Sequence, residues 1–247
     1  MLTISARRKV PTIDSADNRA WRSSEQQMRL DPERTAALLC DVWDRHWCPS
    51  AERRLEALVP TIDRVVEALR GRGVLIVHAP SETMDHYAHD PARQRIRSAV
   101  GDPPRQPDPE PAPEMPVVVG RTHGCDASID APAGSPWTRQ HSGIGIDQER
   151  DVISDDGSEL AEFYGQRQID TVIVMGVHTN MCILNRTFAI RALVRQGFQP
   201  LLVRDLTDAM YDPADPPYVT HDEGTRLVIE YIEKFFCPTI TSAMLLD

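Results

Sequence analysis

The sequence predicts an α/β fold, a three-layer sandwich with a mostly parallel, doubly wound central sheet. Short apolar runs that suit buried strands alternate along the chain with longer segments of helical periodicity. The chain has 247 residues, of which 41% are apolar, enough to form the core of one such domain. We therefore expect the functional residues beyond the carboxyl ends of the strands, where open α/β sheets bind their ligands.

The first third of the sequence contains an arm and one strand–helix–strand unit. Residues 1–34 are polar and contain two prolines, so they are expected to form an irregular N-terminal arm. TAALLC (35–40) and VLIVHA (74–79) are expected to be buried strands, and residues 51–72 have the apolar spacing of a helix. Such a unit is normally right-handed, with its two strands parallel.

The middle of the chain, residues 101–150, predicts a long loop excursion. Its first part, 101–116, contains seven prolines in sixteen positions, and residues 120–150 are rich in Gly, Pro, Asp and Ser. Loops of this length in compact domains are usually functional or disordered. We expect residues 35–247 to form a single domain that carries this excursion.

A regular pattern resumes after the loop. Helices are expected over 158–168, 180–197 and 226–236, and strands over 171–176 and 200–205. The alternation continues the parallel sheet and places helices on both of its faces.

Composition limits the partners and the compartment. The formal net charge is −10 and no basic stripe occurs, which argues against nucleic acid and against an anionic membrane surface. No apolar run has the length of a membrane span or of a secretory signal. The five cysteines are an odd number without CxxC spacing, so a disulfide framework is not expected and a cytoplasmic setting fits best. No glycine-rich phosphate loop occurs, so no nucleotide cofactor is implied.

The strongest chemical signal is a cysteine at a strand-to-helix elbow. The strand over 171–176 ends at Gly176, and a helix follows with Thr179 or Asn180 as its cap, which places Cys182 in the first helical turn. Free backbone N–H groups and the helix dipole at that position favour an anion and can lower a thiol pKa to between roughly 3.5 and 7.5. Cys182 is therefore a candidate nucleophile, and the alternative is a small buried apolar residue.

The segment GVHTNMCILNRTFAIRALVRQGFQPLLVRDLTDA resembles the signature of the isochorismatase-like cysteine hydrolases, which include nicotinamidases and N-carbamoylsarcosine amidohydrolases. The matching pieces are Gly176-Val177-x-Thr179-x-x-Cys182 and the strand that ends in Asp205. Asp41, at the end of the first expected strand, matches the acidic residue of the family. The resemblance extends from residue 35 to about residue 240.

The resemblance implies a mechanism. Cys182 attacks, Asp41 takes its proton, and the N–H groups of His178 and Cys182 form the oxyanion hole. The Val177–His178 peptide is expected to be cis. The implied reaction is hydrolysis of a small molecule, at a non-peptide C–N bond of an amide or ureido group, by a protein that forms homo-oligomers.

One feature of the family is missing. Its catalytic lysine falls near Ser154 or Asp155 in this sequence, and no lysine occurs between Lys9 and Lys234. Another cation could replace it, the site could act through Cys182 and Asp41 alone with altered activity, or the protein could bind a small molecule without catalysis. The candidate cations from the loops beside the site are Arg121, Arg139, His123, His141 and His178.

Further pocket residues are expected next to Asp41 and on the long loop. Trp43 and Trp47 could contact a planar or apolar substrate, together with His178, and Arg121 and Arg139 could bind a substrate carboxylate. Asp44 and His46 are weak candidates for a divalent metal, because their spacing matches no specific metal signature. No cofactor is otherwise expected. An activated, accessible cysteine could also serve as a redox-sensing thiol.

Overall fold

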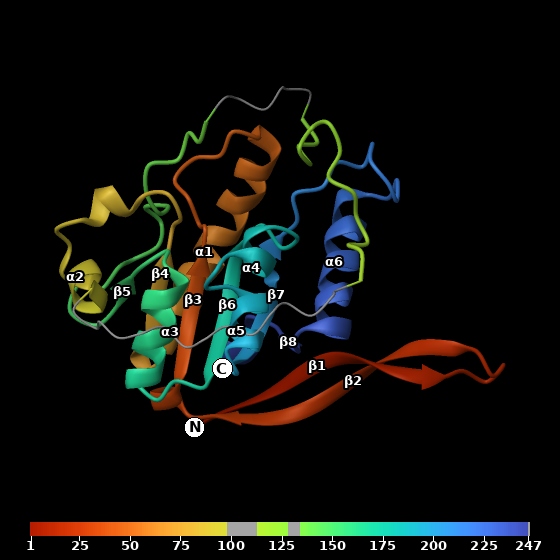
Figure 1. Ribbon diagram of the computed structural model, residues 1–247, viewed down its shortest axis with the longest axis horizontal. Coiled ribbons are helices and arrows are strands. Elements are labelled where there is room, and N and C mark those ends of the chain that lie inside the picture. The colour runs from red at the N-terminus through yellow and green to blue at the C-terminus, as the bar shows by residue number, and fades with distance from the viewer. Residues whose placement is uncertain (98–112, 128–133, 247) are drawn as a thin grey trace.

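A mostly parallel sheet of eight strands organises the chain (Figure 1), which confirms the predicted fold class. The computed structural model describes residues 1–97, 113–127 and 134–246. The strand order is β2-β1-β8-β7-β6-β3-β4-β5. The strands are β1 (Leu2–Ile13), β2 (Arg19–Leu30), β3 (Thr35–Cys40), β4 (Leu75–Ala79), β5 (Val152–Ile153), β6 (Thr171–Val177), β7 (Gln199–Asp208) and β8 (Thr239–Ile240).

The centre of the sheet is formed by β3 and β6, which pair in parallel from Thr35 opposite Thr171 to Cys40 opposite Gly176. Every residue of both strands is buried. This explains their continuous apolar sequences, since a strand covered on both faces has no solvent side. The register pairs Cys40 with Gly176, so the chain leaves both strands at the same level of the sheet.

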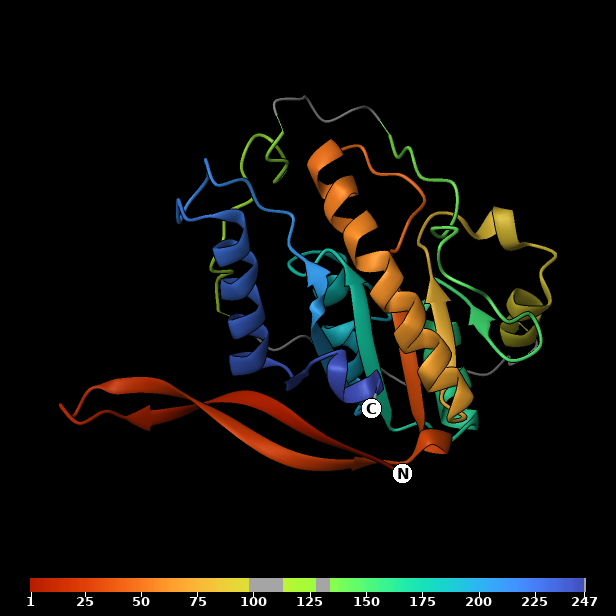
Figure 2. The same ribbon diagram turned by 180° about the vertical axis from the view of Figure 1, so that it is seen from behind.

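Helices cover both faces of the sheet (Figures 1 and 2), as the three-layer prediction requires. The α-helices are α1 (Pro49–Gly71), α2 (Pro91–Arg97), α3 (Gly157–Gln166), α4 (Cys182–Asn185), α5 (Ile190–Arg195), α6 (His221–Phe235) and α7 (Ala243–Leu246), and the 3₁₀ helices are η1 (Pro32–Arg34) and η2 (Met84–Tyr87). One apolar core joins α3, α4, α5 and α6 to the sheet, and the other joins α1 and α7 to its opposite face.

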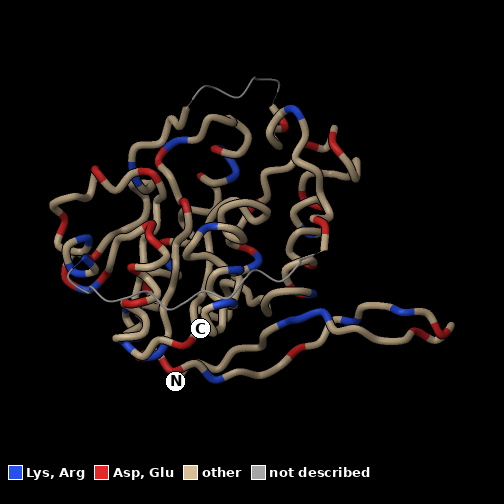
Figure 3. The backbone as a smooth tube through the Cα atoms, in the orientation of Figure 1, with Lys and Arg blue, Asp and Glu red and all other residues tan. Residues whose placement is uncertain are grey.

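The N-terminal arm differs from its prediction. Residues 1–34 were expected to be irregular, but β1 and β2 form an antiparallel hairpin of twelve residues per strand, which extends away from the body (Figure 1). Among the described residues, the hairpin pairs with the rest of the sheet only at Arg7, opposite Thr239 of β8. Figure 3 shows the basic run Arg7–Lys9 on this hairpin. Most of its side chains face solvent, and this is why its sequence lacks the apolar pattern of a buried strand.

The prediction of one continuous helix over 180–197 is also wrong in one respect. The chain forms two short helices there, α4 and α5, because Arg186 leaves the helical conformation with a ψ of 152°. The Phe188 and Ala189 side chains between them are buried in the same core as both helices, so the apolar periodicity continues across the break and hides it.

The long loop is described only in part. Of the proline-rich segment 101–116, residues 101–112 lie outside the described residues. The described parts of 120–150 contain no helix or strand, and an isolated bridge between Gln140 and Trp43 holds this segment against the end of β3. Within the described part of the chain, no helix combines the length and apolar character needed to cross a membrane.

Candidate active site

The close approach of β3 and β6 creates the site. Gly176 has a φ of 116°, and a Cβ atom there would collide with the carbonyl oxygen of Cys40 on the neighbouring strand. Only glycine allows this backbone conformation and this contact. Directly after the contact, Asp41 turns with a φ of 55°, and β6 leads through Val177 into the elbow that carries Cys182. The two strand ends therefore bring Asp41 and Cys182 together.

Asp41 is fully buried and has three polar neighbours. The backbone N–H of Ser81 donates to its Oδ1 over 2.8 Å, and Nε of Arg186 donates to its Oδ2 over 3.0 Å. The thiol of Cys182 lies beside the same carboxyl group and lowers its pKa. The structure thus places one carboxylate, one thiol and one guanidinium in direct contact.

Arg186 is the cation that the sequence analysis missed. It ends α4, four residues after Cys182, so both side chains lie on the same side of this helical turn. The expected continuous helix gave no reason to single it out, although the spacing of four residues from the cysteine was a usable signal. Its NH2 group also lies 3.6 Å from the Glu82 carboxylate at the rim of the site.

The charges of this cluster favour a neutral thiol at rest. Burial, together with the Asp41 carboxylate, raises the pKa of Cys182 to about 12, against the opposing effects of Arg186 and of the His178 backbone amide. This differs from the lowered thiol pKa that the helix-start position suggested. Burial also raises the pKa of Asp41, while Arg186 and the hydrogen bonds to Cys182 and Ser81 lower it. A nucleophilic attack by this thiol would therefore need a base, and the Asp41 carboxylate lies beside it.

The elbow closes around the carbonyl group of His178. The Val177–His178 peptide is cis, and the N–H groups of Met181 and Ile183 both donate to the His178 oxygen, over 3.0 and 3.2 Å. The His178 backbone N–H is close enough to the Cys182 sulfur to lower the pKa of the thiol. This N–H group is therefore next to the atom that would attack a substrate.

A pocket of about 550 Å³ opens above the thiol. Its residues come from the ends of β3 and β6 and from the long loop. The residues that line it include Trp43, His46, Trp47, Glu82, His123, Trp137, His178, Cys182 and Arg186. Trp137 stacks on Trp43 with ring centroids 4.1 Å apart, so these indoles form a flat aromatic wall. Trp137, on the long loop, was not singled out from the sequence.

Glu82 holds the outer side of the pocket. Its carboxylate accepts hydrogen bonds from the Ser135 hydroxyl over 2.9 Å and from the Trp137 indole over 3.3 Å. Its backbone N–H donates to Asp155 over 2.9 Å. Asp155, near which the family lysine was expected, thus contacts this rim residue, while Ser154 is buried and donates to Glu159 over 2.7 Å.

Two of the cations that the sequence suggested, His123 and His178, line the pocket. The other three do not line it. Arg121 is exposed and is not among the pocket residues; Arg139 is half-exposed and lies 3.9 Å from Asp44. His141 pairs with Glu56 of α1 over 2.7 Å.

The two weak metal candidates, Asp44 and His46, have protein partners. Asp44 accepts hydrogen bonds from the N–H and hydroxyl groups of Thr138, over 2.9 and 2.7 Å. Both ring nitrogens of His46 are hydrogen-bonded, to the Cys48 N–H and to His178. Among the described residues, no group of three or more His, Cys, Asp or Glu side chains is arranged to hold a metal ion.

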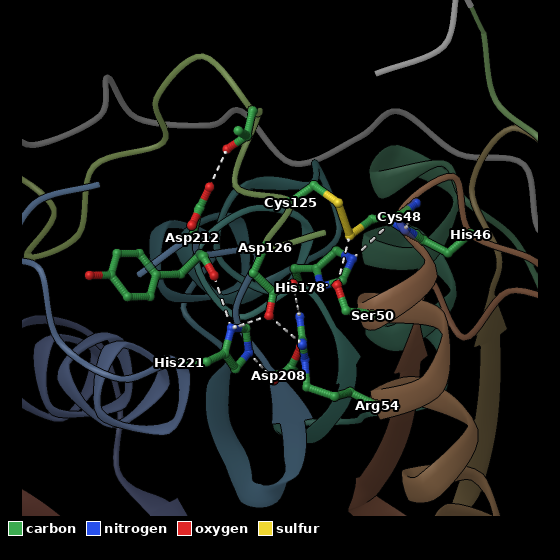
Figure 4. The surroundings of a disulfide bond; sticks show 12 residues. His46, Cys48, Ser50, Arg54, Cys125, Asp126, His178, Asp208, Asp212 and His221 are labelled. Atoms are coloured by element: carbon green, nitrogen blue, oxygen red, sulfur yellow. Dashed lines mark hydrogen bonds and ion pairs between the residues drawn. A yellow bond between two sulfur atoms is a disulfide. The ribbon is translucent and has the colours of Figure 1, made fainter. Parts of the chain in front are cut away.

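A disulfide adjoins the pocket, contrary to the expectation from cysteine spacing. Cys48 and Cys125 are bonded, with their Cα atoms 5.7 Å apart (Figure 4). They are 77 residues apart in sequence, and the fold brings the start of α1 against the long loop, so no local motif could have predicted the pair. Cys40, Cys182 and Cys237 are free.

The comparisons with known proteins agree with this architecture. Residues 150–244 match the model of the isochorismatase domain. A cysteine hydrolase from Pseudomonas syringae pv. phaseolicola 1448A is similar in structure, with a TM-score of 0.57, 20% identity, and coverage of 88% of this chain and 92% of that chain.

Two further solved structures show the same likeness. An isochorismatase family protein from Burkholderia thailandensis has a TM-score of 0.52 at 14% identity, covering 88% of this chain and 97% of that one. An isochorismatase from Pseudomonas putida KT2440 also has a TM-score of 0.52 at 14% identity, with coverage of 87% and 91%. No curated protein matches the sequence. Residues 150–244 thus match the isochorismatase domain, and the chain shares the α/β fold of these solved structures.

Proposed function

We propose that the protein is a cysteine hydrolase that cleaves a non-peptide C–N bond, in an amide or ureido group of a small molecule. The observation that carries the proposal is the contact of Asp41 with both Cys182 and Arg186. A buried carboxylate hydrogen-bonded to a thiol can accept its proton, and a neighbouring guanidinium can offset the charges that develop.

The reaction begins when the Cys182 sulfur attacks the substrate carbonyl carbon and its proton moves to Asp41. The resulting oxyanion accepts hydrogen bonds from the backbone N–H groups of His178 and Cys182. The C–N bond then breaks, and Asp41 returns the proton to the leaving nitrogen. Asp41 next takes a proton from water, which attacks the thioester, releases the acid and restores the thiol.

Arg186 supports this proposal over the alternative of a small-molecule binding protein without catalysis. That alternative was motivated by the absent lysine, because a site with only acidic groups would repel a thiolate. The guanidinium, 3.0 Å from Asp41, supplies a permanent positive charge at this place. An aromatic wall of Trp43 and Trp137 suits the planar face of an amide or ureido substrate.

The test is a screen of small primary amides and ureido compounds for release of ammonia. A responsive compound is then incubated with the protein, quenched in acid, and the Cys182 peptide is searched by mass spectrometry for the acyl group. We expect a thioester on Cys182 in the wild type and neither adduct nor ammonia with Cys182→Ala. Turnover that persists in Cys182→Ala would contradict the proposal.

A further inference from the structure

A chain of hydrogen bonds runs from the disulfide to the elbow of the candidate active site (Figure 4). The backbone N–H of Cys48 donates to Nδ1 of His46 over 3.0 Å. Nε2 of His46 lies 3.1 Å from Nε2 of His178. His46 and His178 are 8% and 3% exposed, so water contributes little to either contact.

The direction of these bonds follows from the chemistry of imidazole. Because a backbone N–H can only donate, Nδ1 of His46 must accept and carries no proton. A neutral His46 then has its proton on Nε2 and donates it to His178, so His178 has its own proton on Nδ1. Burial lowers the pKa of His46 and lowers that of His178 to about 3, so both rings are neutral near pH 7.

The disulfide holds both ends of this series of hydrogen bonds in place. Cys48 is the N-cap of α1, and Cys125 ties it to the loop that carries Asp126. Arg54, also on α1, donates to Asp126 over 2.9 Å and to Asp208 over 3.0 Å, as Figure 4 shows. The Asp208 carbonyl oxygen in turn accepts the N–H of Thr179, the residue after His178.

We propose that His46, held by the Cys48–Cys125 disulfide, is a positioning residue that orients His178 and thereby aims the His178 backbone N–H at Cys182. The proposal rests on the function proposed above, because it assigns His46 to the oxyanion side of that site. His46 does not act on the substrate itself; it acts through the histidine whose backbone amide contacts the nucleophile.

The consequence is measurable without a substrate. The hydrogen bond from the His178 amide lowers the thiol pKa of Cys182, so misplacing that amide raises the pKa and reduces the thiolate fraction at a given pH. Loss of one such bond corresponds to about a 2- to 10-fold slower alkylation of Cys182 below its pKa.

The first experiment measures alkylation by iodoacetamide against pH, with Cys182 resolved by peptide mass spectrometry. We expect His46→Ala to slow alkylation about 2- to 10-fold, and His46→Gln, whose amide can accept from Cys48 and donate to His178, to restore most of the rate. His141→Ala is the matched control, because His141 also contacts α1 but lies outside the pocket and should keep the wild-type rate. A wild-type rate in His46→Ala would overturn the proposal.

The disulfide is tested in the same assay. The double variant Cys48→Ser with Cys125→Ser, and wild type reduced by a phosphine (two electrons to the disulfide, giving two thiols), should both slow Cys182 alkylation. Circular dichroism of each sample checks that the fold remains. Unchanged alkylation in both samples would show that the disulfide does not hold His46.

The second experiment is independent of catalysis. Long-range proton–nitrogen NMR of protein with labelled histidine reports which ring nitrogen carries the proton. We expect the Nε2–H form for His46 and the Nδ1–H form for His178, and the opposite pair would refute the chain of bonds. If no amide is hydrolysed but these forms are found and His46→Ala still slows alkylation, the positioning role stands and the proposed function fails.

Discussion

Nε of Arg186 lies 3.0 Å from Oδ2 of Asp41. Arg186 is four residues after Cys182, whose thiol lies beside the same carboxylate. A guanidinium is charged at every accessible pH and binds a carboxylate in a fixed plane, whereas a lysine ammonium is a mobile point charge. The positive charge of this site therefore comes from the helical turn that carries Cys182, the proposed nucleophile. Arg186 also forms an ion pair with Glu82, which connects the charged cluster to the pocket rim.

Substitution of Arg186 should separate charge from geometry. Arg186→Gln removes the charge that lowers the pKa of both Asp41 and Cys182, so alkylation at neutral pH should slow and kcat/KM should fall by about 10²- to 10³-fold. Arg186→Lys keeps the charge and should lose less in both assays. Arg121→Gln, an exposed arginine outside the pocket, is the control. Equal losses in the Gln and Lys variants would mean that planar geometry matters and charge does not.

Asp41→Asn should move thiol reactivity and turnover in opposite directions. The Asp41 carboxylate is one of the groups that raise the Cys182 pKa, so its removal should lower that pKa and speed alkylation at alkaline pH. Hydrolysis should stop, because the proposed mechanism needs the Asp41 carboxylate to accept the thiol proton. Alkylation profiles and ammonia release measured on the same preparation test both halves. Slower alkylation in Asp41→Asn would contradict the charge assignment.

Gly176→Ala should destabilise the fold at the point where β3 and β6 lie closest. The added methyl group meets the Cys40 carbonyl, and alanine disfavours a φ of 116°, so we expect a loss of at least about 2 kcal/mol in the free energy of unfolding. Urea denaturation measures the loss. Gly197→Ala is the matched control: its φ is 85° but its Cβ position is open, so it carries backbone strain without the collision. Because only Gly176→Ala adds the collision, it should lose more unfolding free energy than Gly197→Ala.

The sequence predicted the parts of the fold whose signals are local. Strands such as β3 and β6 are covered on both faces, and this constraint appears directly as an apolar run. The hairpin of β1 and β2 had no such signal, because its stability comes from pairing between strands and from contacts with α6. The Cys48–Cys125 bond and the contact between Arg186 and Asp41 depend on residues 77 and 145 positions apart, and only the folded topology brings them together.

The hairpin should detach when the ion pair between Arg7 and the buried Glu233 is broken. Nε of Arg7 donates to Glu233 over 2.8 Å, and the Glu233 side chain is 0% exposed. Arg7→Met leaves that carboxylate without its cation, which costs about 3–5 kcal/mol for a buried pair. We expect a lower thermal midpoint and faster amide exchange in β1 and β2. Arg8→Met, at the exposed neighbouring position, is the control and should change neither.

Asp151 should make stability depend on pH in a defined window. Burial opposes its ionisation, but hydrogen bonds from His78 and Arg70 outweigh burial and lower its pKa from 3.8 to about 2. Because the folded pKa is the lower one, this carboxylate contributes stability above pH 3.8 that is lost as the pH falls towards 2. The shift corresponds to about 2 kcal/mol.

In Asp151→Asn this dependence should disappear, and the partly buried Arg70 should lose its ionic partner, at a cost of about 3–5 kcal/mol near pH 7. Urea denaturation at several pH values tests both effects, with Glu149→Gln in the same loop as an exposed control. If wild type and Asp151→Asn lose stability in parallel between pH 3.8 and 2, other carboxylates cause the acid sensitivity and the assignment to Asp151 is wrong.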